Sequence, residues 1–214
     1  MTLAAHWPVV DLRITTPTLE LRWPDLDDLT ALATLAAKGV HDPAVQPFSV
    51  EWTDGTPEER ARRALTWHWR CLGEWRPEAW ALNFVVVQDG EVVGSQTVAA
   101  DNFAIRREVR TGSWLGIAHH GRGIGTEMRA AVLHLAFAHL GAETAVSGAF
   151  LDNVASTRVS RRLGYEVNGV DVHVVRGKRA LQHRFRLTRT NWQPRHDISV
   201  SGVSSCLDFL DART

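Results

Sequence analysis

Hydrophobic and polar positions change their spacing several times along the chain, and each change marks a predicted element. Alternating apolar residues predict strands over residues 18–23, 80–87, 91–99, 108–117, 166–175 and 180–188. A run of small and apolar residues over 144–150 predicts an internal strand. Spacings of about 3.6 residues predict helices over residues 25–38, 57–72, 124–140 and 153–163.

The turns and the order of these elements indicate the fold class. Asp89-Gly90 is a strong two-residue hairpin signal, and the helix over 124–140 is apolar on both sides, which predicts burial against a sheet. The order of strands and helices indicates a single α/β (α+β) domain with a central, mixed, twisted sheet flanked by about four helices. We place this domain at residues 1–192. Residues 193–214 carry no period, and we expect them to form a mobile C-terminal tail.

Charge and composition exclude several classes of protein. The 214 residues include 24 Lys and Arg and 24 Asp and Glu, without the basic excess of nucleic-acid binders or polybasic membrane-surface proteins. No apolar run approaches the ~18 residues of a membrane span, and the start of the chain lacks a secretory leader pattern. Cys71 and Cys206 are too few for a disulfide framework. We therefore expect a cytoplasmic globular protein with no nucleic-acid or membrane partner.

Three glycines at alternate positions, Gly121, Gly123 and Gly125, lie between a predicted strand and the buried helix. Glycine lets backbone N–H groups turn inward without a Cβ in the way, and the positive helix end behind them favours a phosphate or pyrophosphate. A nucleoside triphosphate (Walker A) loop needs a Lys followed by Ser or Thr after its last glycine, which this chain lacks, and a dinucleotide-binding loop places its third glycine one residue later. Both of these ligand classes are therefore disfavoured. A turn that needs glycine only for its geometry is the remaining alternative.

Two motifs resemble a known family. His120-Gly121-Arg122-Gly123-Ile124-Gly125 resembles the acyl-CoA pyrophosphate loop of the GCN5-related N-acetyltransferase (GNAT) superfamily. Asp152-Asn153-Val154-Ala155-Ser156, followed by Leu163-Gly164-Tyr165, resembles the second signature of the branch that contains the ribosomal-protein alanine N-acetyltransferases. Thr18-Leu19-Glu20-Leu21-Arg22 resembles the first strand of that branch, and the resemblance covers residues 17–190.

The resemblance implies where an acyl-CoA would bind. The strand over 108–117 would separate from the strand over 144–150, and the backbone of Leu115 and Ile117 would pair with the pantetheine amides. The N–H groups of the loop would hold the pyrophosphate, with the whole loop taking part: His120, Gly121, Arg122, Gly123, Ile124, Gly125 and Thr126. The resemblance also implies that Asn153 bonds the pantetheine arm. From its position alone Asn153 is equally a helix cap.

Acyl transfer from a thioester needs a neutral amine, a polarised carbonyl and a proton for the leaving thiolate. The resemblance implies that Ser156 supplies this proton, although a serine in the first turn of a helix often bonds only its own backbone. Alignment through Trp114 puts Arg110 at the position of the family's general base. Glu108 lies on the same face of that strand, so we predict it as the base, with a surface role as the alternative. An amine that arrives neutral needs no base.

Arg110 raises a second possibility for the donor. A guanidinium that faces the acyl pocket suits a bidentate pairing with a carboxylate at the end of the acyl group. Some mycobacterial members that the chain resembles use succinyl-CoA, so N-succinyl transfer is the alternative to N-acetyl transfer. A non-catalytic acyl-CoA-binding or sensing domain is the alternative from a different functional class.

The chain has nine tryptophans beside a single tyrosine, and several fall in the segment that would face the acceptor amine. These are Trp52, Trp67, Trp69 and Trp75, with Phe48 beside them. On the predicted helix, Trp69 lies on the apolar line and Trp67 about 200° away, so Trp69 is expected in the core and Trp67 and Trp52 at the acceptor site. Trp114 is expected to pack beside the donor.

Other chemistries have weaker signals. Ten histidines invite a metal reading, but there is no H-E-x-x-H motif, and His134 and His139 are five residues apart and do not share the face of an α-helix. We therefore predict no metal. The sequence predicts an acyltransferase that uses acetyl-CoA or succinyl-CoA as co-substrate, with an amine-bearing acceptor such as a protein N-terminus, a lysine or a small molecule. We also expect a homo-oligomer.

Overall fold

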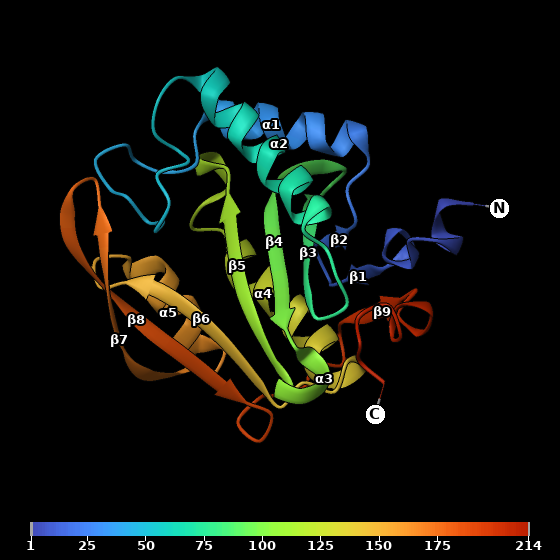
Figure 1. The fold of residues 1–214 in the computed structure, drawn as a ribbon. Helices are drawn as coiled ribbons and strands as arrows, with labels where there is room; N and C mark the ends of the chain where they lie inside the picture. Colours follow the sequence, from blue (N-terminus) through green and yellow to red (C-terminus); the bar gives the residue numbers. More distant parts are fainter. Residues whose placement is uncertain (1, 214) are drawn as a thin grey trace.

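The computed structural model describes residues 2–213. Nine strands form one sheet in the order β7-β8-β6-β5-β4-β3-β2-β1-β9 (Figure 1). The strands are β1 (Arg13–Thr15), β2 (Glu20–Arg22), β3 (Ala79–Gln88), β4 (Glu91–Asp101), β5 (Glu108–Leu115), β6 (Thr144–Phe150), β7 (Glu166–Val175), β8 (Lys178–Thr188) and β9 (Ser199–Ser201). Only β5 and β6 pair in parallel, so the sheet is mixed, as predicted.

The helices form a layer on each face of the sheet (Figure 1). They are α1 (Leu26–Lys38), α2 (Pro57–Gly73), the short α3 (Phe103–Arg106), α4 (Ile124–His134) and α5 (Val154–Arg162). Leu32 of α1 packs on Val85 and Val87 of β3, whereas Leu82 and Phe84 of the same strand join the core formed with α4. Alternate residues of one strand therefore contact different helix layers.

Local signals in the sequence explain where the helices begin. α1 starts with a capping box between Asp25 and Asp28, and α2 starts with a second one between Thr56 and Glu59. The β3–β4 hairpin turns at Asp89-Gly90, where both residues have positive φ, at 50° and 80°. The predicted elements are confirmed, while β1 and α3, each four residues or fewer, lacked a detectable period.

The predicted buried face of α2 is wrong. Ala64 and His68 are its buried residues, and Trp67 and Trp69 are 51% and 53% exposed. Trp75 was also expected beside the acceptor, but it packs against the two ends of the chain: its ring stacks on Phe209 at 5.1 Å between centroids and contacts Trp7 at 5.2 Å. Aromatic residues dominate an apparent period, and here the small Ala64 fits against the neighbouring helix where an indole would not.

The expected separation of His134 and His139 is also wrong. After α4 the chain continues through a π-helical turn over Leu135–His139, and the two imidazole rings lie 5.4 Å apart between centroids. Residues five apart share a face in a π-turn but not in an α-helix. Even so, no group of three or more metal-ligating side chains occurs within residues 2–213.

The C-terminal segment is packed, which corrects the expected mobile tail. β9 pairs with β1, and four apolar side chains beyond the predicted domain boundary are buried: Ile198, Cys206, Leu210 and Ala212. The indole N–H of Trp80 in β3 donates to the carbonyl of Leu210 at 2.9 Å. This segment therefore completes the core at one edge of the sheet.

Candidate active site

The central feature of the sheet is an opening between β5 and β6. The two strands pair only over Glu108–Arg110 and Thr144–Val146. Beyond that point β5 continues its pairing with β4, and β6 continues along β8 (Figure 1). Both strands are thus held firmly on their outer sides, and their inner edges separate, as predicted.

Two side-chain bonds show which backbone groups of β5 face this opening. The Ser147 hydroxyl on β6 donates to the carbonyl of Thr111 at 3.3 Å, while Gln96 on β4 donates to the carbonyl of Gly112 at 2.9 Å. Successive residues of a strand point their N–H and C=O groups to opposite sides. Ser113 and Leu115 therefore face the opening together with Thr111, and the sequence analysis missed Ser113.

Ile117, the second residue expected to pair with pantetheine, is placed differently. It belongs to a 3₁₀ turn after β5, and its N–H donates to the carbonyl of Gly39 at 3.0 Å. The expectation for Ile117 is wrong because that donor is already used. At Leu115 the Nε2 atom of His120 contacts the carbonyl at 3.2 Å, and the N–H faces the opening, where the pairing of β5 with β6 has ended.

The glycine loop has the conformation that an anion site needs. Gly121 and Gly123 adopt φ of 76° and 86°, which side chains rarely allow, and Gly123 is the N-cap of α4. Within the described chain, none of the N–H groups of residues 121–125 donates to a protein acceptor, whereas those of Thr126 and Glu127 donate to the carbonyl of Gly123. Five consecutive free N–H groups at a helix N-terminus form a strong site for a phosphate.

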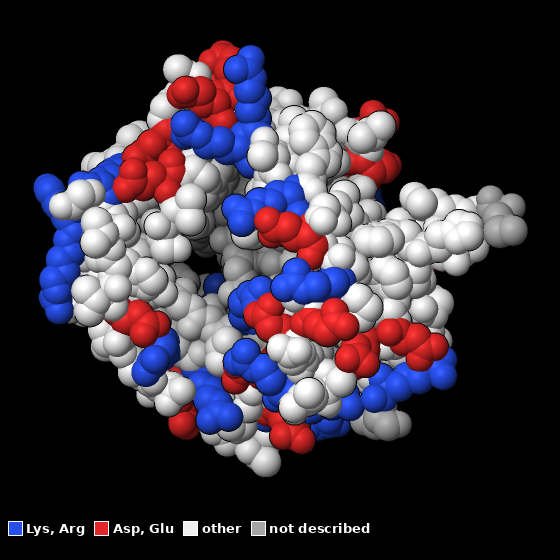
Figure 2. All heavy atoms as spheres, viewed as in Figure 1, with Lys and Arg blue, Asp and Glu red and all other residues white. Residues whose placement is uncertain are grey.

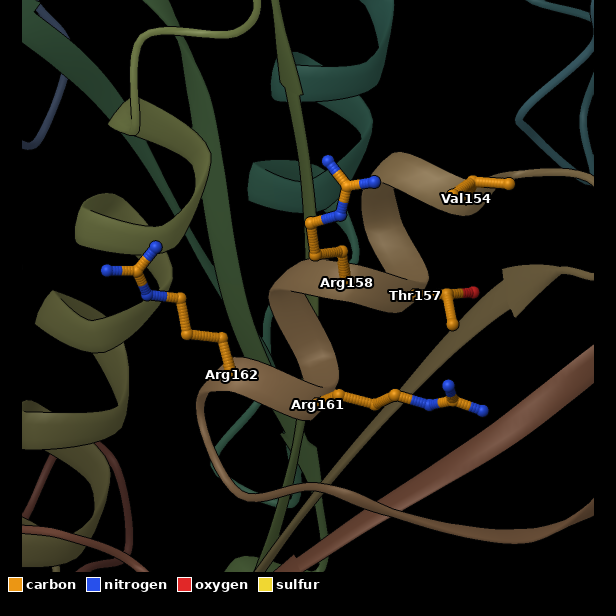
Figure 3. Close-up of a pocket in the computed structure, with 5 residues that line it drawn as sticks. All are labelled: Val154, Thr157, Arg158, Arg161 and Arg162. Carbon is orange, nitrogen blue, oxygen red and sulfur yellow. The ribbon is translucent and has the colours of Figure 1, made fainter.

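Three arginines of α5 lie near this end of the opening, and sequence analysis missed them. Arg158, Arg161 and Arg162 line an open pocket with Val154 and Thr157, and their side chains project from α5 in different directions (Figure 3). Their spacing of three and four residues on a predicted helix was the available signal. Guanidinium groups bind phosphate through paired N–H donors.

Asn153 and Ser156 begin α5 directly after β6. The Asn153 Oδ1 atom accepts the Ser156 N–H at 3.0 Å, so Asn153 is a helix cap, and its amide nitrogen is left to donate elsewhere. The Ser156 hydroxyl has no hydrogen-bond partner within residues 2–213. It is thus available to a ligand rather than being bonded to its own helix.

Glu108 and Arg110 do not meet Ser156. Glu108 starts β5 at the closed end of the opening, where its carboxylate pairs with Arg106 at 2.7 Å and accepts from Thr144 at 3.1 Å. This geometry does not support Glu108 as the base, because both of its oxygens are occupied away from the loop. Arg110 is half exposed and pairs with Asp101 of β4.

Trp52, predicted at the acceptor site, contacts Trp114, which was predicted to pack beside the donor. The Trp52 and Trp114 rings lie 5.4 Å apart, and Phe48 contacts Trp52 at 5.3 Å. Together with Ala36 and Ala64 they form an aromatic patch between the α1–α2 loop and β5. Trp67, also predicted there, makes no aromatic contact with this patch.

A clasp joins the α1–α2 loop to the β7–β8 turn. The guanidinium of Arg176 pairs with Asp54 and donates to the carbonyl of Pro43 at 3.0 Å, and the Arg176 N–H bonds Glu51. The turn thus reaches across the open side of the molecule toward α2 (Figure 1). Figure 2 shows a hollow on this face, with acidic and basic side chains intermixed around it.

A small cavity of about 30 Å³ lies between α1, α2 and β3, and His68, Cys71 and Asn83 are among its lining residues. Burial lowers the pKa of His68 to about 4, so the imidazole is neutral at pH 7. Burial also raises the pKa of the Cys71 thiol, which keeps it protonated and unreactive.

These features define a class of protein. The free edge of β5 can accept an extended ligand, and the five free N–H groups at the start of α4 suit a phosphate at the end of that ligand. An acyl-CoA has both features, so the fold and this site suit an acyl-CoA-dependent acyltransferase. A family model described as acetyltransferase (GNAT) domain matches residues 18–166, most of the chain. The chain belongs to this family, whose activity is N-acetylation with acetyl-CoA. The predicted family, fold class and enzyme class are confirmed.

Solved structures share the fold at low sequence identity. Mycobacterium smegmatis RimJ in complex with CoA-disulfide has a TM-score of 0.70 and 22% identity, covering 94% of this chain and 95% of RimJ. RimL, a ribosomal L7/L12 alpha-N-protein acetyltransferase, has a TM-score of 0.65 and 20% identity, covering 81% and 91%. MccE, a microcin C7 self-immunity acetyltransferase in complex with acetyl-CoA and AMP, has 0.61 and 16%, covering 80% and 93%. Within residues 2–213 no helix has the length and apolar character to cross a bilayer.

Proposed function

We propose that this protein transfers an acetyl group from acetyl-CoA directly to a primary amine, with the donor in the opening between β5 and β6. The observation that carries the proposal is the set of five free N–H groups over residues 121–125 at the mouth of that opening. A phosphate held there directs the rest of the donor along β5, where Ser113 and the N–H of Leu115 lie on an unpaired edge.

The pantetheine arm extends the sheet as an added strand. Its amides bond the Ser113 N–H and C=O and the Leu115 N–H, and the Asn153 amide nitrogen contacts the arm from α5. Arg122, which is exposed, and the arginines of α5 neutralise the phosphates. Thioester and acyl group then lie near the point where β5 and β6 begin to separate.

The transfer itself requires no covalent enzyme intermediate. The neutral amine attacks the thioester carbon, a C–N bond forms, the C–S bond breaks, and its electron pair goes to sulfur. Ser156 gives its proton to the departing thiolate and regains one that the amine nitrogen has lost. The net products are an amide and CoA thiol, and the proton count balances.

No carboxylate is offered as the base. Glu108 is occupied at the closed end of the opening, and an amine with a pKa near that of an α-amino group, ~8, arrives partly neutral at pH 7. Such an amine loses its proton after attack through the hydroxyl of Ser156 or water. A protein N-terminus suits this chemistry better than a lysine with pKa of ~10.

The donor is acetyl-CoA rather than succinyl-CoA in this proposal. The Arg110 guanidinium pairs with Asp101, so a succinyl carboxylate would have to displace a carboxylate that is already in place. Succinyl-CoA stays the competing donor, since Arg110 lies on β5 next to the end of the β5–β6 pairing.

The acceptor enters from the opposite face of the sheet, past the aromatic patch of Phe48, Trp52 and Trp114. RimL is a ribosomal L7/L12 alpha-N-protein acetyltransferase, and MccE binds AMP beside acetyl-CoA, so a protein N-terminus and a small molecule are both candidate acceptors. An apolar patch beside the clasp favours an amine attached to an apolar or aromatic group. Trp67 belongs to the proposal only as an outer contact.

The test is a transfer assay with purified protein, acetyl-CoA or succinyl-CoA, and a panel of peptides and small amines. Thiol release that depends on the amine, with a mass gain of one acetyl group on it, is the expected result. A Ser156→Ala variant should lower kcat while leaving CoA binding unchanged, and Ser199→Ala, an exposed serine of β9, is its control. CoA binding without transfer to any amine would instead establish a sensor.

Compartment and assembly follow as further proposals. Both cysteines are free thiols, which suits the cytoplasm. The homo-oligomer stays a prediction. Strand β7 is at the edge of the sheet with Val170, Val172 and Val174 exposed, and edges of this kind pair with other chains. Light scattering of the purified protein measures its mass in solution.

A further inference from the structure

A positively charged side chain, Arg129 of α4, is buried without an acidic partner. It is 5% exposed, and its Nη1 atom donates to the Ser160 hydroxyl at 2.9 Å. None of the salt bridges in the described chain includes it, and its Nε atom is buried without a hydrogen-bond acceptor. A buried charge without a partner of opposite sign lowers the stability of the fold by roughly several kcal/mol. Stability alone therefore does not explain an arginine at this position.

The surroundings place this guanidinium behind the opening between β5 and β6. Gly125, one helical turn before Arg129, faces the side chains of Leu115 on β5 and Val159 on α5. Ser160 lies one turn after Ser156 on α5. Tyr165 closes the other side, with its hydroxyl 3.4 Å from that of Thr111 on β5. Arg129 therefore lies at the seam of α4 and α5, under the unpaired edge of β5.

Tyr165 is the titratable group that acts electrostatically on Arg129. Burial raises the pKa of the Tyr165 phenol, so it is neutral at the pH of the reaction. Burial lowers the pKa of Arg129, Tyr165 opposes this to a lesser extent, and a guanidinium keeps its proton in proteins. Within residues 2–213, no carboxylate forms a salt bridge with this charge, and the seam keeps one net positive charge.

We propose that Arg129 stabilises the thiolate of CoA as it leaves. The inference rests on the proposed function, since it needs a thioester in the opening. When the C–S bond breaks, its electron pair makes sulfur negative, and that charge appears beside Ser156. Ser156 donates a proton to the sulfur, and Arg129, through Ser160 and the field across the seam, favours the negative sulfur before that proton arrives. Arg129 is a positioning residue and does not contact the donor.

Distance sets the size of the effect. The bond from Arg129 to Ser160 is 2.9 Å long, and one helical turn of ~5.4 Å separates Ser160 from Ser156. A hydrogen bond of ~3 Å from Ser156 to the sulfur brings the total to roughly 11 Å. A full charge at that distance, in a medium with an effective dielectric constant of about 20, changes a rate or an acidity by roughly tenfold. The acidity of CoA bound to the enzyme therefore reports the interaction without any turnover.

The first test needs only the unaltered protein with CoA. The thiolate absorbs in the ultraviolet, and its titration gives the pKa of the bound thiol relative to that of free CoA. We expect the bound thiol to be more acidic by about one pKa unit, the roughly tenfold change expected of a nearby cation. A bound thiol with the pKa of free CoA overturns the proposal, even where transfer to amines proceeds. If CoA does not bind, the proposed function fails first.

Variants then assign the effect to Arg129. Arg129→Met should raise the bound thiol pKa toward that of free CoA and lower kcat roughly tenfold, with KM for the donor little changed. Arg129→Lys, which keeps the charge, should recover most of both, and Arg13→Met removes an exposed charge on β1 as control. A fold stabilised by Arg129 would instead give a lower Tm and a parallel activity loss in Arg129→Met, with the thiol pKa unchanged.

Discussion

Gly123 offers the sharpest test of the donor loop. Its φ of 86° costs an alanine about 1–2 kcal/mol, yet a Cβ built there meets nothing within 4 Å. Gly123→Ala should therefore fold, with a Tm lower by roughly 2–8 °C for a domain of this size. In the proposed complex the phosphate approaches the N–H groups through this open space, which the same Cβ would occupy. Loss of one bond to a charged phosphate, about 1.5–3 kcal/mol, weakens CoA binding by roughly ten- to a hundredfold.

Gly90 provides a matched control, because it has φ of 80° and equally open space around a Cβ. It lies in the β3–β4 turn, remote from the loop. Calorimetric titration with CoA and thermal unfolding should show the same Tm loss for Gly90→Ala and Gly123→Ala, with a weaker CoA complex for Gly123→Ala alone. Equal CoA affinity in the two variants would refute the assignment of the pyrophosphate to this loop.

Three further predictions concern the rest of the molecule. Burial lowers the pKa of His68 to about 4, so the unfolded chain binds more protons than the folded one between pH 4 and 6.5, and stability rises with pH in that window. In urea unfolding, His68→Leu should therefore remove about 2 kcal/mol of the difference in unfolding free energy between pH 7 and pH 5. An unchanged difference would contradict the burial of a neutral imidazole. Arg176→Ala should raise the KM for the acceptor several-fold without changing the affinity for CoA. As a control, Arg184→Ala removes an exposed ion pair of the same hairpin and should leave both constants unchanged. A loss of CoA affinity in Arg176→Ala would place the clasp on the donor side instead. Truncation after Trp192 should lower the unfolding free energy by at least about 3 kcal/mol, since it removes the buried Ile198 and Leu210. A truncated chain as stable as the full one would show that residues 193–214 lie outside the folded domain.

The sequence predicted the fold well where its signals were local. The helices predicted over residues 25–38 and 57–72 are present as α1 and α2, and Asp89-Gly90 turns the β3–β4 hairpin as predicted. The alternating glycines also determined the loop conformation, because positive φ at Gly121 and Gly123 is a property of those residues themselves.

Tertiary contacts decided what the sequence could not. The backbone of Ile117 was predicted to face the donor, but the carbonyl of Gly39, far along the chain, takes its N–H. The face that α2 buries depends on how closely it approaches α1, which no period in α2 alone contains. Glu108 lies on the expected strand face, but Arg106 and Thr144 occupy its carboxylate.

Arg129 shows a different limit. In the sequence it is the one arginine of a helix that is mostly apolar, and its burial follows from the packing of α4 against α5. A charged residue on a face that the period marks as buried was the available signal.

Hydrogen exchange with and without CoA tests the central claim most directly, since the claim concerns backbone N–H groups. The amides of Ser113, Leu115 and residues 121–125 should become protected on binding, while those of the β3–β4 turn at Asp89 and Gly90 stay as they were. Binding of CoA that leaves both segments unprotected would contradict a donor site in the opening between β5 and β6.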